Sequence, residues 1–315
     1  MNSNTNLLNP LVSVIVTVYN HEQFIKRCLD SILSQITSFE FEILVGVDES
    51  TDNSLAICKR IEAKFDNVKV IANDRGNILL INGLRVGRMN FVNSIKHAQA
   101  KYIARCDGDD FWTNPDKLQK QVDFLEKNPQ YSMCFTNFNI VDGKNDVINE
   151  NGWDGKKTEN IDHIEVLSRY SPLPSATLYR REYLPQKFPT QFFRVYGGDY
   201  FLHALITKHG QCHFINEVMA SYRIHSGGIW SLKSDEEKYN RQMHTYKVSW
   251  TYFTEKEERE AIRMAIRRPF KNLFWIYTQD GKVQFLKKNF SLFWIALKYG
   301  LLKEWWQLNK KLLKK

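Results

Sequence analysis

Short apolar runs alternate with amphipathic helical patterns over the first third of the chain. Residues 11–18 (LVSVIVTV) form a continuous β-branched run, which is typical of a strand covered on both faces. Similar runs occupy residues 41–47, residues 68–72 and the stretch that begins at Tyr102, and helical patterns separate them. This order predicts an α/β fold with a Rossmann-like, mainly parallel sheet flanked by helices.

The second half of the chain has a looser pattern. Residues 77–88 are apolar but lack a clear period, so we predict an irregular loop over a site there. The elements expected after this loop are helices over 114–127 and 161–170, strands over 131–141, 175–180 and 213–223, and a helix beginning near Asp199.

Polar side chains follow the ends of the predicted parallel strands. Tyr19 and Asn20 come after the first strand, Asp48 after the second, and Asp107 to Asp110 after the fourth. In open α/β sheets, ligands bind in the crevice outside the carboxyl ends of the strands. The sequence therefore predicts a ligand site at that edge. It contains neither GxGxxG nor GxxxxGK[ST], so a dinucleotide fingerprint and a P-loop are both excluded.

The stretch from Tyr102 to Trp112, YIARCDGDDFW, holds three carboxylates within four residues. Such carboxylates repel one another unless a cation holds them. Mg²⁺ or Mn²⁺ is typically bound by one or two carboxylates together with substrate phosphates. The stretch therefore indicates a divalent metal site. The alternative is a solvated acidic loop that caps the helix after Asn114.

Four ordered stretches together resemble the family 2 glycosyltransferases, inverting enzymes of the GT-A fold that use nucleotide-activated sugars. They read VSVIVTVYNHEQFIKRCLDSILSQ, ILVGVDESTDNS, YIARCDGDDFWTNPDKLQKQVDFLE, and GGDYFLHALITKHG with INEVMASYRIHSGGIWS. The resemblance implies a GT-A catalytic domain over residues 1–232. Its nucleotide-sugar half would cover about 11–112 and its acceptor half about 113–232, with a helical, basic and aromatic extension over 233–315.

The resemblance also implies roles for the residues that match the family's motifs. Asp48 would contact the nucleotide base, and Tyr19 and Asn20 would line the nucleotide pocket. Asp107 and Asp109 match the DxD motif. Asp107 would reach the ribose side, and both are candidates to hold a Mn²⁺ or Mg²⁺ ion that bridges the diphosphate.

Three further residues match the family in the second half. Asp199 would be the catalytic base, and Arg223 and His225 belong to a segment that would close over the diphosphate. Residue chemistry alone leaves His225 open as a metal ligand, a diphosphate contact or a structural histidine. Arg223 suits phosphate oxygens but could equally pair with an acidic neighbour inside the fold.

These residue types fit the chemistry of glycosyl transfer. The leaving diphosphate needs a cation, and the acceptor hydroxyl needs a carboxylate to take its proton. The implied reaction is metal-dependent, inverting transfer from a nucleoside-diphosphate sugar, most often UDP in the family, to a hydroxyl of a glycan or lipid-linked acceptor. Cell-surface polysaccharide synthesis is the expected setting.

Two other classes compete with this hypothesis. One is a catalytically silent module of the same fold that binds glycans or scaffolds a membrane assembly. The other is a nucleotidyltransferase, which needs a basic, Gly-rich loop after the first strand. VTVYNHEQF has no such loop, so this second class is disfavoured.

The net charge of +9 is concentrated in the tail, where residues 263–315 hold 13 Lys and Arg against Asp280 and Glu304. In residues 274–315, tryptophans alternate with lysines and apolar stripes, a composition typical of an interfacial helix. We therefore expect this segment to contact a membrane surface. The alternative is that its apolar stripes pack on the catalytic domain or on a second subunit. A basic, aromatic surface also suits nucleic acid, but the acidic crevice argues against that partner.

The sequence also predicts a location. The first ten residues, MNSNTNLLNP, have neither a basic n-region nor an apolar h-region, and no run approaches ~18 apolar residues. Five scattered cysteines without a CxxC pair indicate reduced core thiols. We therefore expect a cytoplasmic protein that is peripheral on the inner face of the cell membrane. A homo-oligomer is compatible with this reading.

Overall fold

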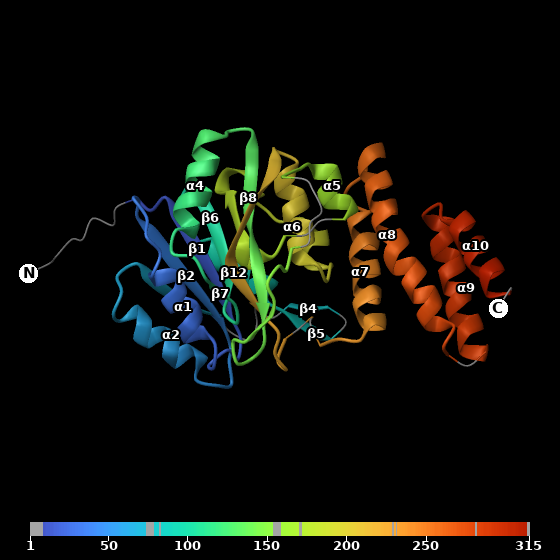
Figure 1. Ribbon diagram of the computed structural model, residues 1–315, viewed down its shortest axis with the longest axis horizontal. Coiled ribbons are helices and arrows are strands. Elements are labelled where there is room, and N and C mark those ends of the chain that lie inside the picture. The colour runs from blue at the N-terminus through green and yellow to red at the C-terminus, as the bar shows by residue number, and fades with distance from the viewer. Residues whose placement is uncertain are drawn as a thin grey trace, which may run out of the picture. The chain divides into compact units, whose positions relative to one another are not determined.

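The structure is a computed structural model that describes residues 9–73, 79–81, 83–153, 159–169, 172–228, 230, 232–280 and 282–313 (Figure 1). The chain divides into two compact units. We call them the sheet unit (residues 1–163, 171–188 and 202–227) and the helical unit (residues 164–170, 189–201 and 228–315). The domain boundary expected at residue 232 stays a prediction.

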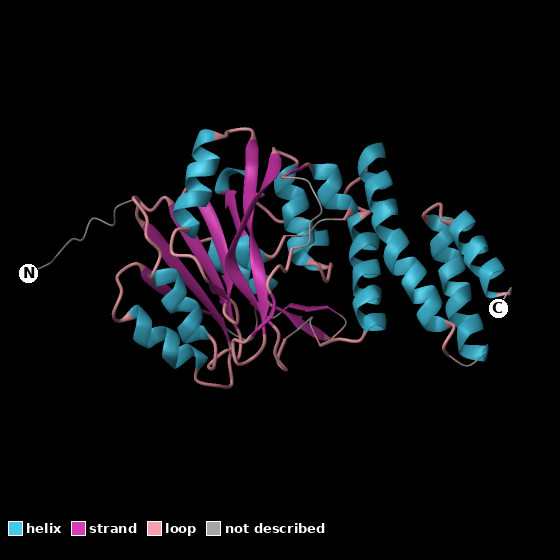
Figure 2. Ribbon diagram, viewed as in Figure 1, coloured by secondary structure: helices cyan, strands magenta, loops and turns pink. Residues whose placement is uncertain are grey.

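One ten-stranded sheet organises the described part of the sheet unit, with the central order β10-β12-β8-β11-β6-β1-β2-β3 (Figure 2). Its parallel half is β1 (Val12–Val18), β2 (Phe41–Asp48), β3 (Val68–Asn73) and β6 (Tyr102–Asp107). These are the four strands predicted from the apolar runs. Because β1 lies in the centre of this half, its side chains from Val12 to Val16 are fully buried.

The other half of the sheet mixes directions. Its strands are β8 (Tyr131–Val141), β11 (Thr177–Arg180), β12 (Gln211–Arg223), β10 (Asn160–Ile161), and the short β7 (Phe111–Trp112) and β9 (Val147–Asn149). β11 runs antiparallel to both β6 and β8, and β12 runs parallel to β8. The carboxyl end of β12 therefore lies at the same edge of the sheet as those of β1, β2 and β6. The predicted α/β, GT-A-like fold class is confirmed.

The helices of the parallel half each bury one face, which is apolar in α1 and partly polar in α3. They are α1 (Ile25–Leu33), α2 (Ser54–Glu62), α3 (Arg88–Ile95) and α4 (Lys117–Lys127). In α1, the buried residues recur at the three- and four-residue spacing of one helix face: Ile25, Cys28, Leu29 and Ile32. All five cysteines of the chain are buried free thiols.

The prediction of an irregular loop over 77–88 was partly wrong. Residues 77, 78 and 82 lie outside the described residues, but β4 (Leu79–Ile81) and β5 (Leu84–Val86) form an antiparallel hairpin. The reason is local: Gly83 has φ +79°, the left-handed conformation that a tight hairpin turn requires. The sequence signal is the Asn-Gly pair at 82–83 between two apolar runs, which is a strong hairpin signature.

Three other predicted elements differ from the structure in where they begin or end. The helix expected from Asn114 begins at Lys117, because the Asn114 side chain instead accepts the backbone N–H of Asp116 at 2.8 Å and holds a turn. The region expected as one helix over 161–170 is β10 followed by α5 (His163–Ser168), and residue 170 lies outside the described residues. The strand expected from Ser175 begins at Thr177, after a 3₁₀ turn over Pro174–Ala176.

Gly46 marks a close contact between β2 and α3. A Cβ there would lie 1.8 Å from Asn90 Oδ1 and 2.2 Å from Ser94 Oγ, both on α3. Gly46→Ala is therefore expected to lower the free energy of unfolding by about 2–3 kcal/mol, since overpacking pushes the helix from the sheet. Urea unfolding with Gly87→Ala as the control measures this, because nothing lies within 4 Å of a Cβ at Gly87. Equal midpoints for the two variants would contradict the close contact.

The helical unit contains α7 (Asp235–Ser249), α8 (Lys256–Tyr277), α9 (Lys282–Lys298) and α10 (Leu302–Leu312), and α6 (Gly198–Thr207) begins in it. Local sequence sets the helix starts: Ser234 Oγ accepts the Glu237 N–H, and Glu255 with Glu258 forms a capping box. α8 continues through Pro269 to Tyr277. Among the described helices, none combines the length and the apolar composition that crossing a bilayer requires.

Candidate active site

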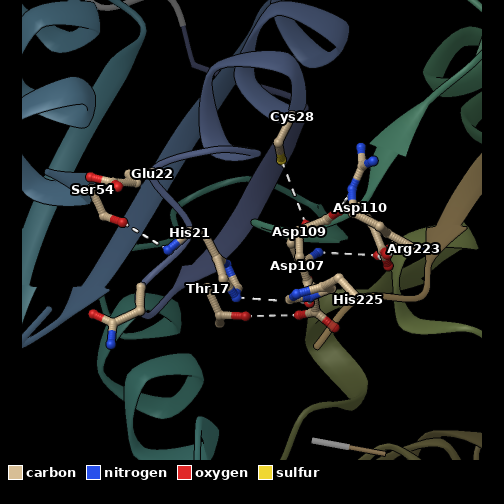
Figure 3. Close-up of polar contacts among 12 residues, drawn as sticks. Thr17, His21, Glu22, Cys28, Ser54, Asp107, Asp109, Asp110, Arg223 and His225 are labelled. Atoms are coloured by element: carbon tan, nitrogen blue, oxygen red, sulfur yellow. Dashed lines mark hydrogen bonds and ion pairs between the residues drawn. The ribbon is translucent and has the colours of Figure 1, made fainter. Parts of the chain in front are cut away.

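The carboxylate loop leaves the sheet at the end of β6, beside the end of β1. Thr17 and Asp107 are partners in the parallel register of the two strands. The Thr17 hydroxyl donates to Asp107 Oδ1 at 2.7 Å (Figure 3). The Arg105 guanidinium lies 3.4 Å from the same oxygen. The backbone N–H of Asp107 donates to Ser175 Oγ at 3.1 Å. Asp107 is therefore held in place by three neighbours, with its carboxylate one-third exposed.

Gly108 allows the loop to turn tightly against β1. Its N–H donates to the carbonyl oxygen of Thr17 at 2.9 Å. A Cβ at this position would lie 2.9 Å from His21 Nδ1 and 3.0 Å from the same carbonyl oxygen. Because only glycine fits this space, the turn brings Asp109 up against the segment that follows β1.

Asp109 lies between two histidines that come from distant parts of the chain. Its Oδ2 is 3.0 Å from His225 Nε2 and 3.7 Å from His21 Nε2 (Figure 3). The two imidazole rings meet edge to face, with centroids 6.2 Å apart. Burial raises the pKa of Asp109, but the charge of His21 and the hydrogen bond from His225 outweigh it, so the pKa lies below the usual range. Asp109 is therefore a carboxylate at neutral pH.

The Asp109–His225 pair fits two ligands of a small divalent ion. Within the described residues, no group of three or more His, Cys, Asp or Glu side chains is arranged to hold a metal. Two adjacent ligands at about 2.1 Å from an octahedral ion lie about 3 Å apart, which is the separation of Asp109 Oδ2 and His225 Nε2. A site with so few protein ligands suits Mn²⁺ or Mg²⁺, since such ions take their remaining ligands from water and substrate phosphates.

Asp110, the third carboxylate of the loop, points away from this pair into the fold. It is 2% exposed; its Oδ2 accepts the Ser175 hydroxyl at 2.6 Å and its Oδ1 accepts the Arg223 N–H at 3.0 Å. Burial and the charges of Asp109 and Asp107 raise the pKa of Asp110 well above its usual value. Asp110 therefore joins the loop to β12, a structural role that the acidic pattern did not separate from metal binding.

Arg223 is also committed to the fold around the loop. Its Nε donates to the carbonyl oxygen of Asp109 at 2.7 Å, and its Nη1 donates to Asn145 Oδ1 at 2.7 Å and to the carbonyl oxygen of Asp142 at 3.2 Å. The guanidinium lies 4.7 Å from the centroid of the Phe24 ring. Arg223 therefore holds the backbone of the DxD loop in place through its hydrogen bond to the carbonyl oxygen of Asp109.

The residues predicted for the nucleotide lie at the neighbouring strand ends. Asn20 has φ +54°, and its Oδ1 accepts the Thr51 N–H at 2.8 Å, which ties the loop after β1 to the loop after β2. Asp48 ends β2 and is buried, at 6% exposed. Tyr19 is 37% exposed. Loops at two adjacent strand ends are thus joined beside the carboxylate loop.

The structure brings some predicted residues together and adds one. Asp107, Asp109, Arg223 and His225 form one cluster in the sheet unit. His21 joins this cluster; its only sequence signal was its place directly after Asn20. Asp199 is half-buried in the first turn of α6, in the part of that helix that belongs to the helical unit, and its role stays a prediction.

Known proteins are similar to this chain in sequence and in fold. The family model "Glycosyl transferase family 2" matches residues 13–196. A curated relative from Mycobacterium tuberculosis is 29% identical over 232 residues; the match covers 72% of this chain and 63% of the relative. The Escherichia coli protein WfgD, a UDP-Glc:alpha-D-GlcNAc-diphosphoundecaprenol beta-1,3-glucosyltransferase, is also 29% identical, over 72% of this chain and 83% of its own length.

A solved structure extends the likeness in fold along the chain. The mannosyltransferase PcManGT from Pyrobaculum calidifontis, in complex with GDP-Man and Mn²⁺, has a TM-score of 0.57 at 15% identity. The superposition covers 98% of this chain and 87% of that one. Together with the family match over more than half of the residues, the sheet order and the carboxylate loop lead to one conclusion: this chain belongs to glycosyl transferase family 2.

Proposed function

We propose that the protein is a divalent-metal-dependent, inverting glycosyltransferase that moves a sugar from a nucleoside diphosphate to a hydroxyl of a glycan or lipid-linked acceptor. The observation that carries this proposal is the Asp109–His225 pair, 3.0 Å apart, with His21 beside it. The pair lies where β6 and β12 end, at the edge of the sheet where α/β proteins bind ligands. A catalytically silent module would have no need of a carboxylate kept ionised between two imidazoles.

The donor would lie across the joined strand ends. Asp48, Tyr19 and Asn20 would contact the base and its surroundings, and Asp107 would reach the ribose. UDP is the proposed nucleotide, since the name of the relative WfgD specifies UDP-Glc. The same name specifies a diphosphoundecaprenol acceptor, which supports a lipid-linked acceptor for this chain. A cytoplasmic location and a role in surface-polysaccharide synthesis fit that donor and acceptor.

The proposed chemistry divides the work among three places in the chain. Asp109 and His225, with Asp107 nearby, would hold the divalent ion, which neutralises charge on the diphosphate as it leaves. Arg223 would keep the DxD loop in position through its hydrogen bond to the Asp109 carbonyl oxygen. Asp199 would accept the proton of the acceptor hydroxyl, so that oxygen attacks the sugar carbon from the face opposite the diphosphate. Single displacement inverts that carbon and requires no covalent nucleophile.

Metal-dependent donor binding tests this proposal directly. Saturating UDP-sugar with Mn²⁺ is expected to raise the melting temperature by about 5 °C, because ligand at about 100 Kd adds about 2.7 kcal/mol to the stability of the folded state. EDTA should abolish the rise, and Asp109→Ala should lose most of it. Asp123→Ala is the matched control, since its carboxylate lies on the exposed face of α4 and bonds only Gln119 among the described residues.

The outcomes separate the hypotheses. A rise that persists in EDTA and in Asp109→Ala would contradict the metal site but not donor binding. No rise with UDP-, dTDP- or GDP-sugars would favour the silent module.

A further inference from the structure

Helix α9 exposes an apolar stripe on the side opposite its packed face. Its five members are 46–66% exposed and, at 3.6 residues per turn, fall within an arc of about 80°: Val283, Leu286, Phe290, Trp294 and Leu297. The residues that α9 buries, including Leu292 and Ala296, lie on a different side of the helix. The stripe is therefore not required for packing within the helical unit, and a contiguous exposed apolar surface is a mark of an interaction site.

Helix α10 carries a second stripe of the same kind. Leu302 and Trp306 are 40% and 57% exposed, and Leu313, just after the helix, is 87% exposed. At 3.6 residues per turn, these three lie within an arc of about 40°. We call the two stripes together the α9–α10 face.

Contacts between the two helices place both stripes on one side. The Asn289 amide donates to Asn309 Oδ1 at 2.7 Å, and the Phe293 and Trp305 rings meet at 5.1 Å. These pairs show that α9 and α10 run antiparallel (Figure 1). When each helix is viewed from its own N-terminus, its stripe lies on the same rotational side of the residues that contact the other helix. Two antiparallel helices related in this way present their stripes to the same side.

Lysines border the α9–α10 face on both outer edges. Lys287 and Lys298 flank the stripe on α9, and Lys303 and Lys310 flank the stripe on α10; all four are exposed. Among the described residues, no carboxylate forms an ion pair with any of them. The acids nearby are already paired: Glu304 with Arg267 at 3.0 Å, and Asp280 with Lys288 at 3.0 Å. The face therefore has an apolar centre, rich in Trp and Phe, and a cationic rim.

A basic hollow continues this rim. It has a volume of about 440 Å³, and its lining includes Lys298 together with Lys256, Arg259 and Arg263. Its one acid, Glu260, is paired with Arg263. The hollow therefore has more positive than negative charge next to Lys298. This charge suits an anionic group such as a phosphate.

We propose that the α9–α10 face docks on the surface of an anionic lipid bilayer. Trp294, Phe290 and Trp306 would enter the boundary between headgroups and acyl chains, and the rim lysines and the hollow would contact lipid phosphates. Apolar aromatic stripes with basic flanks are the pattern of helices that lie in this boundary. A second copy of the chain fits the face less well, because an isologous contact would bring two identical rims of lysines together.

Vesicle binding tests the proposal with the full chain. Co-sedimentation is measured with phosphatidylcholine vesicles and with vesicles containing one-quarter phosphatidylglycerol. The wild type is expected to bind the anionic vesicles at least about tenfold more tightly, with binding that weakens in high salt. Phe290→Glu should reduce that binding at least about tenfold, since it removes an aromatic side chain that would enter the bilayer and adds a charge. Ile36→Glu is the matched control: its side chain is 65% exposed, as against 63% for Phe290.

A second variant tests the role of the lysine rim. Changing four lysines to Gln together should remove most of the salt dependence of binding: Lys287, Lys298, Lys303 and Lys310. Each lysine near the membrane surface contributes at most about fivefold to the affinity. The four changes together should therefore reduce binding to anionic vesicles at least about twentyfold. Circular dichroism of each variant establishes that the helical unit remains folded.

Three results would overturn the proposal. The first is equal binding of the wild type and Phe290→Glu to anionic vesicles, and the second is no binding by the wild type at all. The third is a wild-type dimer in analytical ultracentrifugation that Phe290→Glu converts to monomer without any vesicle binding, which would assign the face to a second copy. None of these results depends on sugar transfer, so failure here leaves the proposed reaction intact.

Discussion

Asp199→Asn is expected to lower the rate of sugar transfer by about 10²- to 10⁴-fold while leaving donor affinity unchanged. The amide keeps the shape of the carboxylate but cannot accept a proton, and general-base catalysis contributes a factor of about that size. Donor affinity should persist because the residues proposed to hold the diphosphate, Asp109 and His225, are untouched. The expected signature is therefore a fall in kcat with little change in the donor KM.

The measurement needs a control for the helix position. Asp199 lies in the first turn of α6, where any carboxylate also interacts favourably with the helix N-terminus. Asp235 likewise lies in the first turn of α7, so Asp235→Asn is the control that loses a helix-end interaction alone. Turnover is measured at saturating donor by release of the nucleoside diphosphate, and donor affinity by the metal-dependent thermal shift. Near-full turnover by Asp199→Asn would show that another group takes the proton.

The parallel half of the fold could be predicted because its signal is strong at short range. Each of its four strands is a run of β-branched and apolar residues, and the helices between them repeat at the spacing of one buried face. β7 gave no such signal, since Phe111 and Trp112 are too few to show a period. The antiparallel insertion of β11 between β6 and β8 depends on pairing between residues far apart in the chain, which periodicity does not report.

The candidate site was predictable in its residue types but not in its geometry. The resemblance to the DxD motif pointed to Asp107 and Asp109, but the acidic composition of the loop alone does not separate Asp109, beside two histidines, from Asp110, buried against Ser175. That difference follows from the turn at Gly108, where there is no room for a side chain. The same turn brings His21 to Asp109, a contact over 88 residues of sequence that only the folded chain reveals.

The buried amine of Lys117 should make the free energy of unfolding depend on pH. Lys117 begins α4 and is fully buried; its Nζ donates to Gln121 Oε1 at 2.6 Å and lies 4.3 Å from the centroid of the Trp112 ring. Burial lowers the pKa of Lys117 to about 7, because no carboxylate among the described residues offsets the loss of water around the ammonium. At neutral pH, much of this amine is therefore uncharged in the folded protein.

Stability should rise with pH as a consequence. Between pH 7 and about 10 the unfolded chain, with a lysine pKa near 10.4, binds a proton that the folded chain has lost. The free energy of unfolding therefore increases with pH, by up to about 1.4 kcal/mol per pH unit from this residue alone. The gain is small below pH 7, where Lys117 is protonated in both states.

Lys117→Met should remove this pH dependence and stabilise the protein at pH 7. The shift in the lysine pKa costs the folded state about 4 kcal/mol at that pH, and methionine has a similar length without the charge. Against this gain, Gln121 Oε1 loses its donor, at a cost of about 1–3 kcal/mol, so the net gain should be about 2 kcal/mol. Urea unfolding of both proteins at pH 7 and pH 10 measures the effect. Because the lysine's cost is mostly gone by pH 10, the stability order of the two proteins should reverse there. A constant difference between them at both pH values would show that Lys117 is charged in the folded protein.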